Sequence, residues 1–324
     1  MTKPFIHLRC LSSYSLSEST LKIEKLVNLA KKNNMPALAI TDNNNMFGVF
    51  EFSQECVNNN IQPIIGTSIN LIDVQLKNTI SQLSFLVKNE IGYKNLIYLS
   101  SLSYLNKNRD LGISIADIEG HTEGLFCFLG GEFNPLLILH NQNKQTDDFI
   151  NTLKKLFKNN LLFELQRIND SNIDSFEDYL IEKSYKFNIP LIGTNNIKFG
   201  EVDEFSAHDA LLCVAQKTTI NSGNRKTSNN QIAFKSNDQM IDIFFDIPEI
   251  VENNFNVAIS CSYYPREVLP KLPKFKNNLN LSESDLLIKI SSNGLDEKIK
   301  ENHISDEKKY KERLNYEIEI INKM

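Results

Sequence analysis

The chain has 324 residues, 41% of them hydrophobic, and carries 35 Lys and Arg against 40 Asp and Glu, a net charge of −5. This length suits one large α/β domain or two domains, and the apolar share is enough for a packed core. The charge argues against a segment that grips nucleic acid alone, and the N-terminus and the apolar runs predict neither a signal peptide nor a membrane span.

Seven short apolar runs in the first 200 residues are candidate strands. Short continuous runs of this kind are typical of strands buried on both faces, as in a parallel sheet. The runs lie at residues 5–8, 37–40, 63–65, 83–87, 125–129, 161–165 and 190–193.

Amphipathic patterns between these runs predict helices. They cover residues 21–33, 48–59, 92–105, 147–159 and 171–187. Seven β-α units in series predict a barrel or a doubly wound sheet, and the hydrophobic pattern does not choose between the two.

Helical patterns dominate after residue 200, at 204–214, 238–245 and 248–261. Ser236 and Gln239 have the spacing of a capping box at the start of the middle helix. Three prolines punctuate residues 264–276, which we expect to be an extended linker. Two further helices are predicted, around 283–290 and from about 306 onward.

The last predicted helix carries an apolar stripe of Tyr310, Leu314, Ile318 and Ile321, with no Gly or Pro stop before Met324. This pattern predicts a chain cut from a longer one. The alternative is a natural end that frays or packs on the core.

The five cysteines are widely spaced and form no C-x-x-C pair, which argues against a zinc knuckle or a disulfide framework. We expect buried free thiols in a protein of the reducing cytoplasm. These residues are Cys10, Cys56, Cys127, Cys213 and Cys261. The chain also contains no Walker loop, no G-x-G-x-x-G, no H-E-x-x-H and no G-x-S-x-G motif.

Motifs in a fixed order cover almost the whole chain. They read HLRCLSSYS at 7–15, MPALAITDNNNMFG at 35–48, IQPIIG at 61–66, NEIGYKNL at 89–96, GTNNIKF at 193–199 before Asp203 and His208, FDIPEI at 245–250, residues 254–261, and YEIEIINKM at 316–324. Together they resemble the N-terminal PHP (polymerase and histidinol phosphatase) region of the bacterial DNA polymerase III alpha subunit, a replicative C-family polymerase.

The resemblance implies a distorted seven-stranded β/α barrel, followed by a mainly helical segment that leads into a polymerase palm. It divides the chain into a PHP-like barrel core at 1–200, a helical completion of the PHP region at 201–263, a Pro-containing linker at 264–280 and the truncated start of the palm region at 281–324.

In PHP enzymes, the loops at the carboxyl ends of the strands carry His, Asp, Glu and sometimes Cys, which hold about three divalent metals that activate water. This sequence departs from that pattern at nearly every position. Arg9 and Leu11 replace the opening H-x-H, and neither side chain can ligate a metal. Glu18 is the one acidic ligand that survives. The remaining ligand positions hold Asn43, Ser68, Gln82, Gly131, Asn196 and Lys198.

Amides and hydroxyls are weak ligands for zinc or manganese, and Arg9 and Lys198 bring positive charge to the expected metal positions. We therefore expect no metal cluster, no cofactor and no catalytic residue in this chain, and neither phosphoesterase nor exonuclease activity.

His7, Asp203 and His208 could be combined with Glu18 as the ligands of one metal site. We interpret His7 instead as a core or strand-end histidine, and His208 as hydrogen-bonded within its helix. Asp203 and His208 are five residues apart, which is not the i, i+4 spacing that places two ligands on one helix face. Asp42 is expected to bind neighbouring backbone N–H groups at its strand end.

Charges of alternating sign at 307–313 predict a solvated helix face rather than a DNA contact. The linker stretch Lys271–Lys276 is a better candidate for phosphate contacts, although not a favoured one.

The favoured function is the N-terminal fragment of a DNA-directed DNA polymerase (a nucleotidyltransferase) in DNA replication. Its barrel would be a metal-free scaffold that docks the proofreading exonuclease subunit and other holoenzyme subunits. The parent protein would bind DNA, and Mg²⁺ is expected in its palm, beyond this chain. The alternatives are a free-standing metal-dependent PHP phosphoesterase and a separate binding protein that arose from a shortened polymerase gene.

Overall fold

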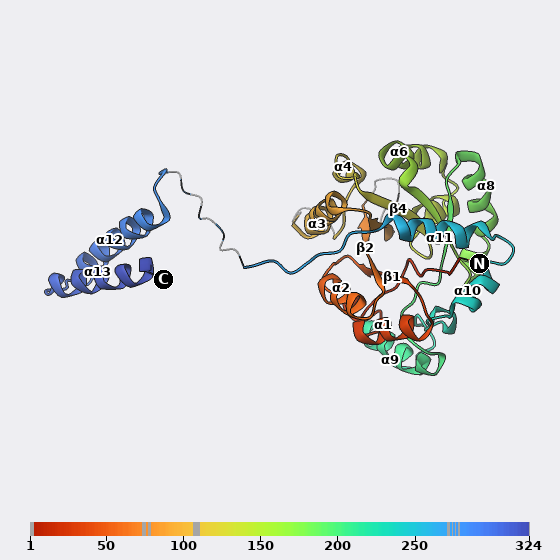
Figure 1. Ribbon diagram of the computed structural model, residues 1–324, viewed down its shortest axis with the longest axis horizontal. Helices are drawn as coiled ribbons and strands as arrows, with labels where there is room; N and C mark the ends of the chain where they lie inside the picture. The colour runs from red at the N-terminus through yellow and green to blue at the C-terminus, as the bar shows by residue number, and fades with distance from the viewer. Residues whose placement is uncertain are drawn as a thin grey trace. The chain divides into compact units, whose positions relative to one another are not determined.

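The computed structural model describes residues 3–72, 76, 79–105, 111–270, 273, 275, 277 and 279–323. Its contacts divide the chain into two compact units, 1–266 and 267–324. In the first unit a curled sheet is surrounded by helices (Figure 1). Within the described ranges, every helix is too short or too polar to cross a membrane.

Among the described residues, six strands form one sheet in which their order along the chain is also their order in space. They confirm six of the seven predicted strands, and their side chains are almost all buried, as continuous apolar runs predict. The strands are β1 (Ala37–Asn43), β2 (Gln62–Leu71), β3 (Ser81–Val87), β4 (Leu125–Gly130), β5 (Leu161–Gln166) and β6 (Leu191–Thr194).

The sheet is mixed, so the expectation of a parallel sheet is wrong for one strand. β3 runs antiparallel to both β2 and β4, while β1–β2, β4–β5 and β5–β6 are parallel pairs. Only residues 72–80 connect β2 to β3. A parallel crossover needs about a dozen residues or more, so this short connection favours antiparallel pairing.

The remaining predicted strand, which is the first along the chain at residues 5–8, does not form. The N-terminal segment nevertheless lies between the two edges of the curled sheet. On one side, His7 O accepts from Ala39 N of β1 at 3.0 Å. On the other side, Leu11 N donates to Ile197 O, beyond β6, at 2.9 Å. The segment therefore bridges the sheet edges without belonging to a regular strand.

Two asparagine side chains explain why the ladder is incomplete here. Asn237 Oδ1 accepts from Phe5 N at 2.6 Å, and Asn254 Nδ2 donates to Ile6 O at 3.0 Å. Asn254 also binds the N–H and C=O of Gly193 in β6, at 3.1 and 2.7 Å. These side chains satisfy backbone groups that a strand neighbour would otherwise satisfy.

The helices of the first unit confirm every predicted helix, with residues 171–187 divided between two of them. Two short helices, α4 and α5, are additional. Ser236 and Gln239 form the predicted capping box. The helices are α1 (Ile23–Lys32), α2 (Val49–Asn58), α3 (Glu90–Leu105), α4 (Ile115–Ile118), α5 (Pro135–Asn141), α6 (Asp147–Phe157), α7 (Ser171–Asp174), α8 (Glu177–Phe187), α9 (Phe205–Ala215), α10 (Asn237–Ile243) and α11 (Glu249–Ser260).

The second unit is a pair of helices, α12 (Glu283–Glu301) and α13 (Glu307–Lys323), that pack on each other. α12 continues past the predicted end at 290 and through Gly294, because a single glycine weakens a helix without stopping it. Of the C-terminal stripe, Ile318 is buried and Leu314 is half-buried, while Tyr310 and Ile321 are exposed.

The charges at 307–313 are exposed, as predicted, and form pairs along the helix such as Lys311–Glu307 at 3.5 Å. Lys271 and Lys276 lie outside the described residues. All five cysteines are buried and unpaired, which confirms the expectation of buried free thiols.

Candidate functional site

A cavity of about 640 Å³ opens where the parallel strands end. Asn44 follows β1, Glu132 follows β4, and Lys198 follows β6, and all three line it. Gln82, another of the expected ligand positions, lies within β3 and also lines the cavity. In β/α folds the carboxyl ends of the parallel strands carry the functional loops.

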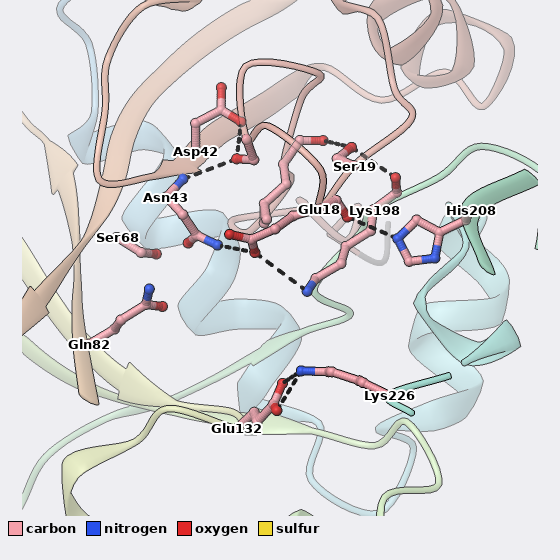
Figure 2. Close-up of polar contacts among 12 residues, drawn as sticks. Glu18, Ser19, Asp42, Asn43, Ser68, Gln82, Glu132, Lys198, His208 and Lys226 are labelled. Atoms are coloured by element: carbon pink, nitrogen blue, oxygen red, sulfur yellow. Dashed lines mark hydrogen bonds and ion pairs between the residues drawn. The ribbon is translucent and has the colours of Figure 1, made fainter. Parts of the chain in front are cut away.

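The loop 216–229 forms one wall of the cavity, and two ion pairs hold it in place. Arg225 binds both carboxylate oxygens of Asp209, at 2.8 and 2.7 Å. Lys226 Nζ lies 2.5 and 2.6 Å from the two oxygens of Glu132 (Figure 2). These pairs connect the loop to α9 and to the end of β4.

Arg9 lies in the sheet interior, where it pairs with Glu164 of β5. Arg9 Nε is 2.7 Å from Glu164 Oε1, and an Arg9 terminal nitrogen is 2.9 Å from Glu164 Oε2. The Glu164 side chain is fully buried, and the Arg9 side chain is 8% exposed. Arg9 also lies over the ring of Phe128, 5.1 Å from its centroid.

Hydroxyl and amide groups complete this buried network. Arg9 donates to Ser84 Oγ of β3 at 2.6 Å, and Ser84 Oγ is 2.8 Å from Ser68 Oγ of β2. Thr194 of β6 donates to Glu164 Oε1 at 2.5 Å, and Gln166 Nε2 lies 3.0 Å from the same oxygen. Since the partners come from four strands, the sheet curls around the Arg9 guanidinium.

Glu18, Asn43 and Lys198 form a second cluster at the cavity (Figure 2). Asn43 Nδ2 donates to Glu18 Oε2 at 2.6 Å. Lys198 Nζ lies 3.9 Å from the same oxygen. Burial lowers the pKa of the Lys198 ammonium, and the nearby Glu18 carboxylate opposes that shift.

The remaining expected ligand positions are dispersed. Leu11 is buried in the apolar core. Gly131 has a φ of +69°, which strains any residue with a Cβ, and a Cβ there would lie 2.8 Å from Gln166 Oε1, so a ligand side chain would require the Gln166 amide to move. Asn196 lines the cavity near Lys198.

The histidines have separate structural partners. His7 Nε2 lies 2.8 Å from Lys235 O, and burial lowers the pKa of this imidazole to about 4. The interpretation that His208 bonds within its own helix is wrong. His208 Nδ1 lies 2.6 Å from Ser228 Oγ, and Nε2 lies 2.9 Å from Glu18 O. It therefore joins α9 to the cavity loops.

Asp42 has the expected structural contacts. Its carboxylate accepts from Ser12 N at 2.7 Å and from the hydroxyls of Ser12 and Ser15, at 2.7 and 2.6 Å. Asp203 lies in a short 3₁₀ helix, is exposed, and does not line the cavity.

Metal-assisted hydrolysis requires several imidazole or carboxylate donors around one point. Within the part of the chain that the structure describes, no three His, Cys, Asp or Glu side chains come together in this way. Glu18 is bound to an amide, Glu132 to a lysine and Glu164 to an arginine. The residues present therefore do not fit the metal cluster that the resemblance implies for active enzymes.

Sequence reasoning missed Glu164 and its hydrogen-bond partners Thr194 and Gln166. A signal was available, because Glu164 is the one charged residue in the apolar run at 161–165. A carboxylate within a buried strand requires a partner, although the sequence does not identify which one.

A family model described as PHP domain matches residues 7–168. Relatives include the DNA polymerase III alpha subunits of Rickettsia bellii, 35% identical, and Caulobacter vibrioides, 30% identical, each aligned over 99% of this chain. The matched part is their N-terminal region. The chain spans only 28% and 29% of the length of these two relatives.

Two solved structures are similar at much lower sequence identity. An amidohydrolase from Chromobacterium violaceum is 11% identical and has a TM-score of 0.39, over 60% of this chain and 87% of that one. A two-domain protein from Bacteroides vulgatus, described as containing a predicted PHP-like metal-dependent phosphoesterase, is 12% identical and has a TM-score of 0.41, over 61% and 52%.

The buried pair makes a strong prediction for stability. Arg9→Met leaves the Glu164 carboxylate buried without its cation, so we expect the free energy of unfolding to fall by about 3–5 kcal/mol. The double variant R9M/E164L should lose less, because it removes both charges. Urea denaturation followed by far-UV circular dichroism measures this, since the chain has no Trp.

The matched control is Lys3→Met, which removes a cation from the exposed pair Lys3–Glu252. Surface pairs contribute about 1 kcal/mol or less, so this variant should unfold almost like the parent. A loss in R9M no larger than that in K3M would contradict the role assigned to Arg9.

His7 should make stability depend on pH. Its folded pKa of about 4 lies below its ordinary value of 6.5, so between these values the unfolded chain binds the extra proton. The free energy of unfolding should therefore fall as pH drops from about 6.5 to about 4, with a His7 contribution of roughly 3 kcal/mol. Denaturation across this range should show a shallower fall for His7→Gln. Equal slopes would refute the assignment.

Proposed function

We propose that this chain, a member of the PHP domain family, is the front part of a replicative DNA polymerase. The proposal rests on its match to the N-terminal region of DNA polymerase III alpha subunits. In this proposal the barrel is a scaffold that binds no catalytic metal. The parent protein performs nucleotidyl transfer in a palm that requires Mg²⁺ and that lies beyond this chain. This chain holds none of that active site.

The pairing of Arg9 with Glu164 carries the proposal. Arg9 stands where active family members are expected to have a histidine ligand, and its guanidinium neutralises the buried carboxylate of β5. A guanidinium does not deprotonate and repels a cation. Lys198 likewise stands at a ligand position and lies beside Glu18, the remaining acid.

The alternative is a free-standing metal-dependent phosphoesterase. That function needs a constellation of anionic and imidazole donors at the strand ends. Here Asn44 and Lys198 follow β1 and β6, and the carboxylate of Glu132 after β4 is bound by Lys226. Alignment with the polymerase subunits also continues through α12 and α13, well past the barrel. Both observations favour the polymerase scaffold.

Metal analysis separates the two functions. After incubation with Zn²⁺ or Mn²⁺ and desalting, we expect the 324-residue chain to retain far less than one metal ion per molecule. We also expect it to release no phosphate from a chromogenic phosphate monoester. Retention of at least one ion, together with phosphate release that EDTA abolishes, would replace the scaffold with the phosphoesterase.

The proposed partner is the separate proofreading exonuclease subunit. A surface that suits it includes Leu16 and Phe47, which are 79% and 70% exposed on adjoining loops beside the cavity. A hydrogen bond from Asn45 Nδ2 to Tyr14 O, at 3.0 Å, holds these loops together. Exposed apolar side chains that gather in one patch mark protein–protein interaction sites.

Mixing the chain with the exonuclease subunit of the same organism tests this docking. We expect co-elution in size-exclusion chromatography, and loss of the complex in L16D/F47D. Leu105→Asp is the matched control, because Leu105 is also 72% exposed but lies on α3. Separate elution of the two unmodified proteins, or equal loss in the control, would count against the assignment.

A further inference from the structure

Lys235 lies on the segment 231–235, next to Asn195 where the chain leaves β6, and it is not among the residues that line the cavity. Its Nζ donates to Asn195 Oδ1 at 2.9 Å and to the backbone oxygen of Gln231. The orientation of the Asn195 amide is fixed, because its Nδ2 donates to Ala233 O at 2.5 Å. Both acceptors of Lys235 are therefore neutral oxygens.

These two acceptors match the neutral form of the lysine side chain. An ammonium has three N–H donors, whereas a neutral amine has two donors and one lone pair. Asn195 and Gln231 satisfy both donors of the neutral amine and leave its lone pair free. Within the described ranges, no third acceptor and no carboxylate lies close enough to Nζ to bind the extra proton of the ammonium.

The electrostatic surroundings of Lys235 favour the neutral amine as well. Burial lowers the pKa of the Lys235 ammonium to about 8, and no described carboxylate opposes the shift. The titratable group that faces Lys235 is the imidazole of His7, whose Nε2 lies 2.8 Å from Lys235 O and which is neutral above about pH 4. At pH 7.5 roughly a quarter of the molecules carry Lys235 as a neutral amine, against about 0.1% for a lysine of ordinary pKa.

This amine is both oriented and in contact with solvent. The Lys235 side chain is half-buried, while Asn195, which orients it, is 1% exposed. A lysine amine that has lost its proton is a nucleophile for carbonyl carbon, and lysines of this kind are targets of acyl transfer. Access and reactivity therefore coincide at Lys235.

We propose that Lys235 is a site of covalent acylation, which takes a small acyl group from a thioester or an acyl phosphate. The Nζ lone pair attacks the acyl carbon, and the bond from this carbon to sulfur or to the phosphate oxygen breaks. A thiolate or a phosphate leaves, and one amine proton passes to water. The product is an amide with a single N–H, so one of the two bonds to Asn195 and Gln231 is lost. Acylation therefore loosens the contact between the segment 231–235 and Asn195, whether or not the parent protein is a polymerase.

Acylation of the 324-residue chain, followed at each lysine by mass spectrometry of its peptides, tests the proposal. The chain is incubated at pH 7.5 with acetyl phosphate or with an acetyl thioester. The internal control is Lys94, which is exposed and paired with Glu90 at 2.7 Å. The Glu90 carboxylate raises the pKa of Lys94, so this ammonium keeps its proton. We expect Lys235 to react at least about tenfold faster than Lys94, although Lys94 is the more exposed of the two. Equal or slower reaction of Lys235 with both donors would overturn the proposal.

The pH profile distinguishes an activated amine from an accessible one. The rate at Lys235 should be half-maximal near pH 8 and level off about one pH unit higher, because the amine is then almost entirely neutral. The rate at Lys94 should continue to rise beyond that point, since Glu90 holds its proton. Identical profiles at the two lysines would refute the activation of Lys235.

Asn195→Asp places a carboxylate beside Nζ with almost no change in size. It should raise the pKa of Lys235 and slow its acylation at pH 7.5 by about tenfold, while the rate at Lys94 stays the same. An unchanged rate at Lys235 in a folded N195D, with folding checked by circular dichroism, would contradict the proposal. If N195D does not fold, the comparison of Lys235 with Lys94 in the parent still decides.

A thermal melt measures the consequence of the modification. Acylation should lower the melting temperature of the parent by about 2–4 °C more than that of Lys235→Arg, because only the parent loses a hydrogen bond at this position. An equal change in both proteins would show that acylation does not loosen the segment. The ratio of the rates at Lys235 and Lys94 with each donor identifies the source of the acyl group, since the donor with the higher ratio is the one that the site favours.

Discussion

The buried pair between Arg9 and Glu164 is the interaction on which the rest of the first unit depends. It places a cation on the N-terminal segment and an anion on β5, so that the two must meet inside the curled sheet. Ser68, Ser84 and Thr194 then bring β2, β3 and β6 to the same point. A pair of this kind adds little net stability when complete but is costly to break, and so it favours one arrangement of the sheet.

The N-terminal segment therefore has a double role. Its backbone bridges the edges of the sheet at β1 and Ile197, and its side chain at position 9 fills the polar centre. The positive charge of Arg9 at this centre disfavours metal binding, because the guanidinium and a metal ion would compete for the same carboxylate. In the proposed function this polar end is a docking surface, and the chemistry of the parent protein occurs elsewhere.

Much of this architecture follows from the sequence, for identifiable reasons. The six strands are continuous apolar runs, and the helices carry regular apolar stripes, so periodicity is enough to find them. The direction of β3 was not predictable from periodicity, because antiparallel and parallel buried strands have the same pattern. At residues 5–8 the apolar pattern predicts a strand, yet Asn237 and Asn254 satisfy backbone groups that a neighbour would pair. The degenerate positions were visible in the motifs, but the partners of Arg9 and His208 depend on long-range contacts that no local pattern contains.

The most direct test of the account is a crystal of the 324-residue chain soaked in Mn²⁺ and measured at a wavelength where manganese scatters anomalously. The account predicts no anomalous peak in the cavity and an Arg9 guanidinium that remains on both oxygens of Glu164. A manganese ion bound by Glu18 or Glu164, with Arg9 displaced from the carboxylate, would contradict it.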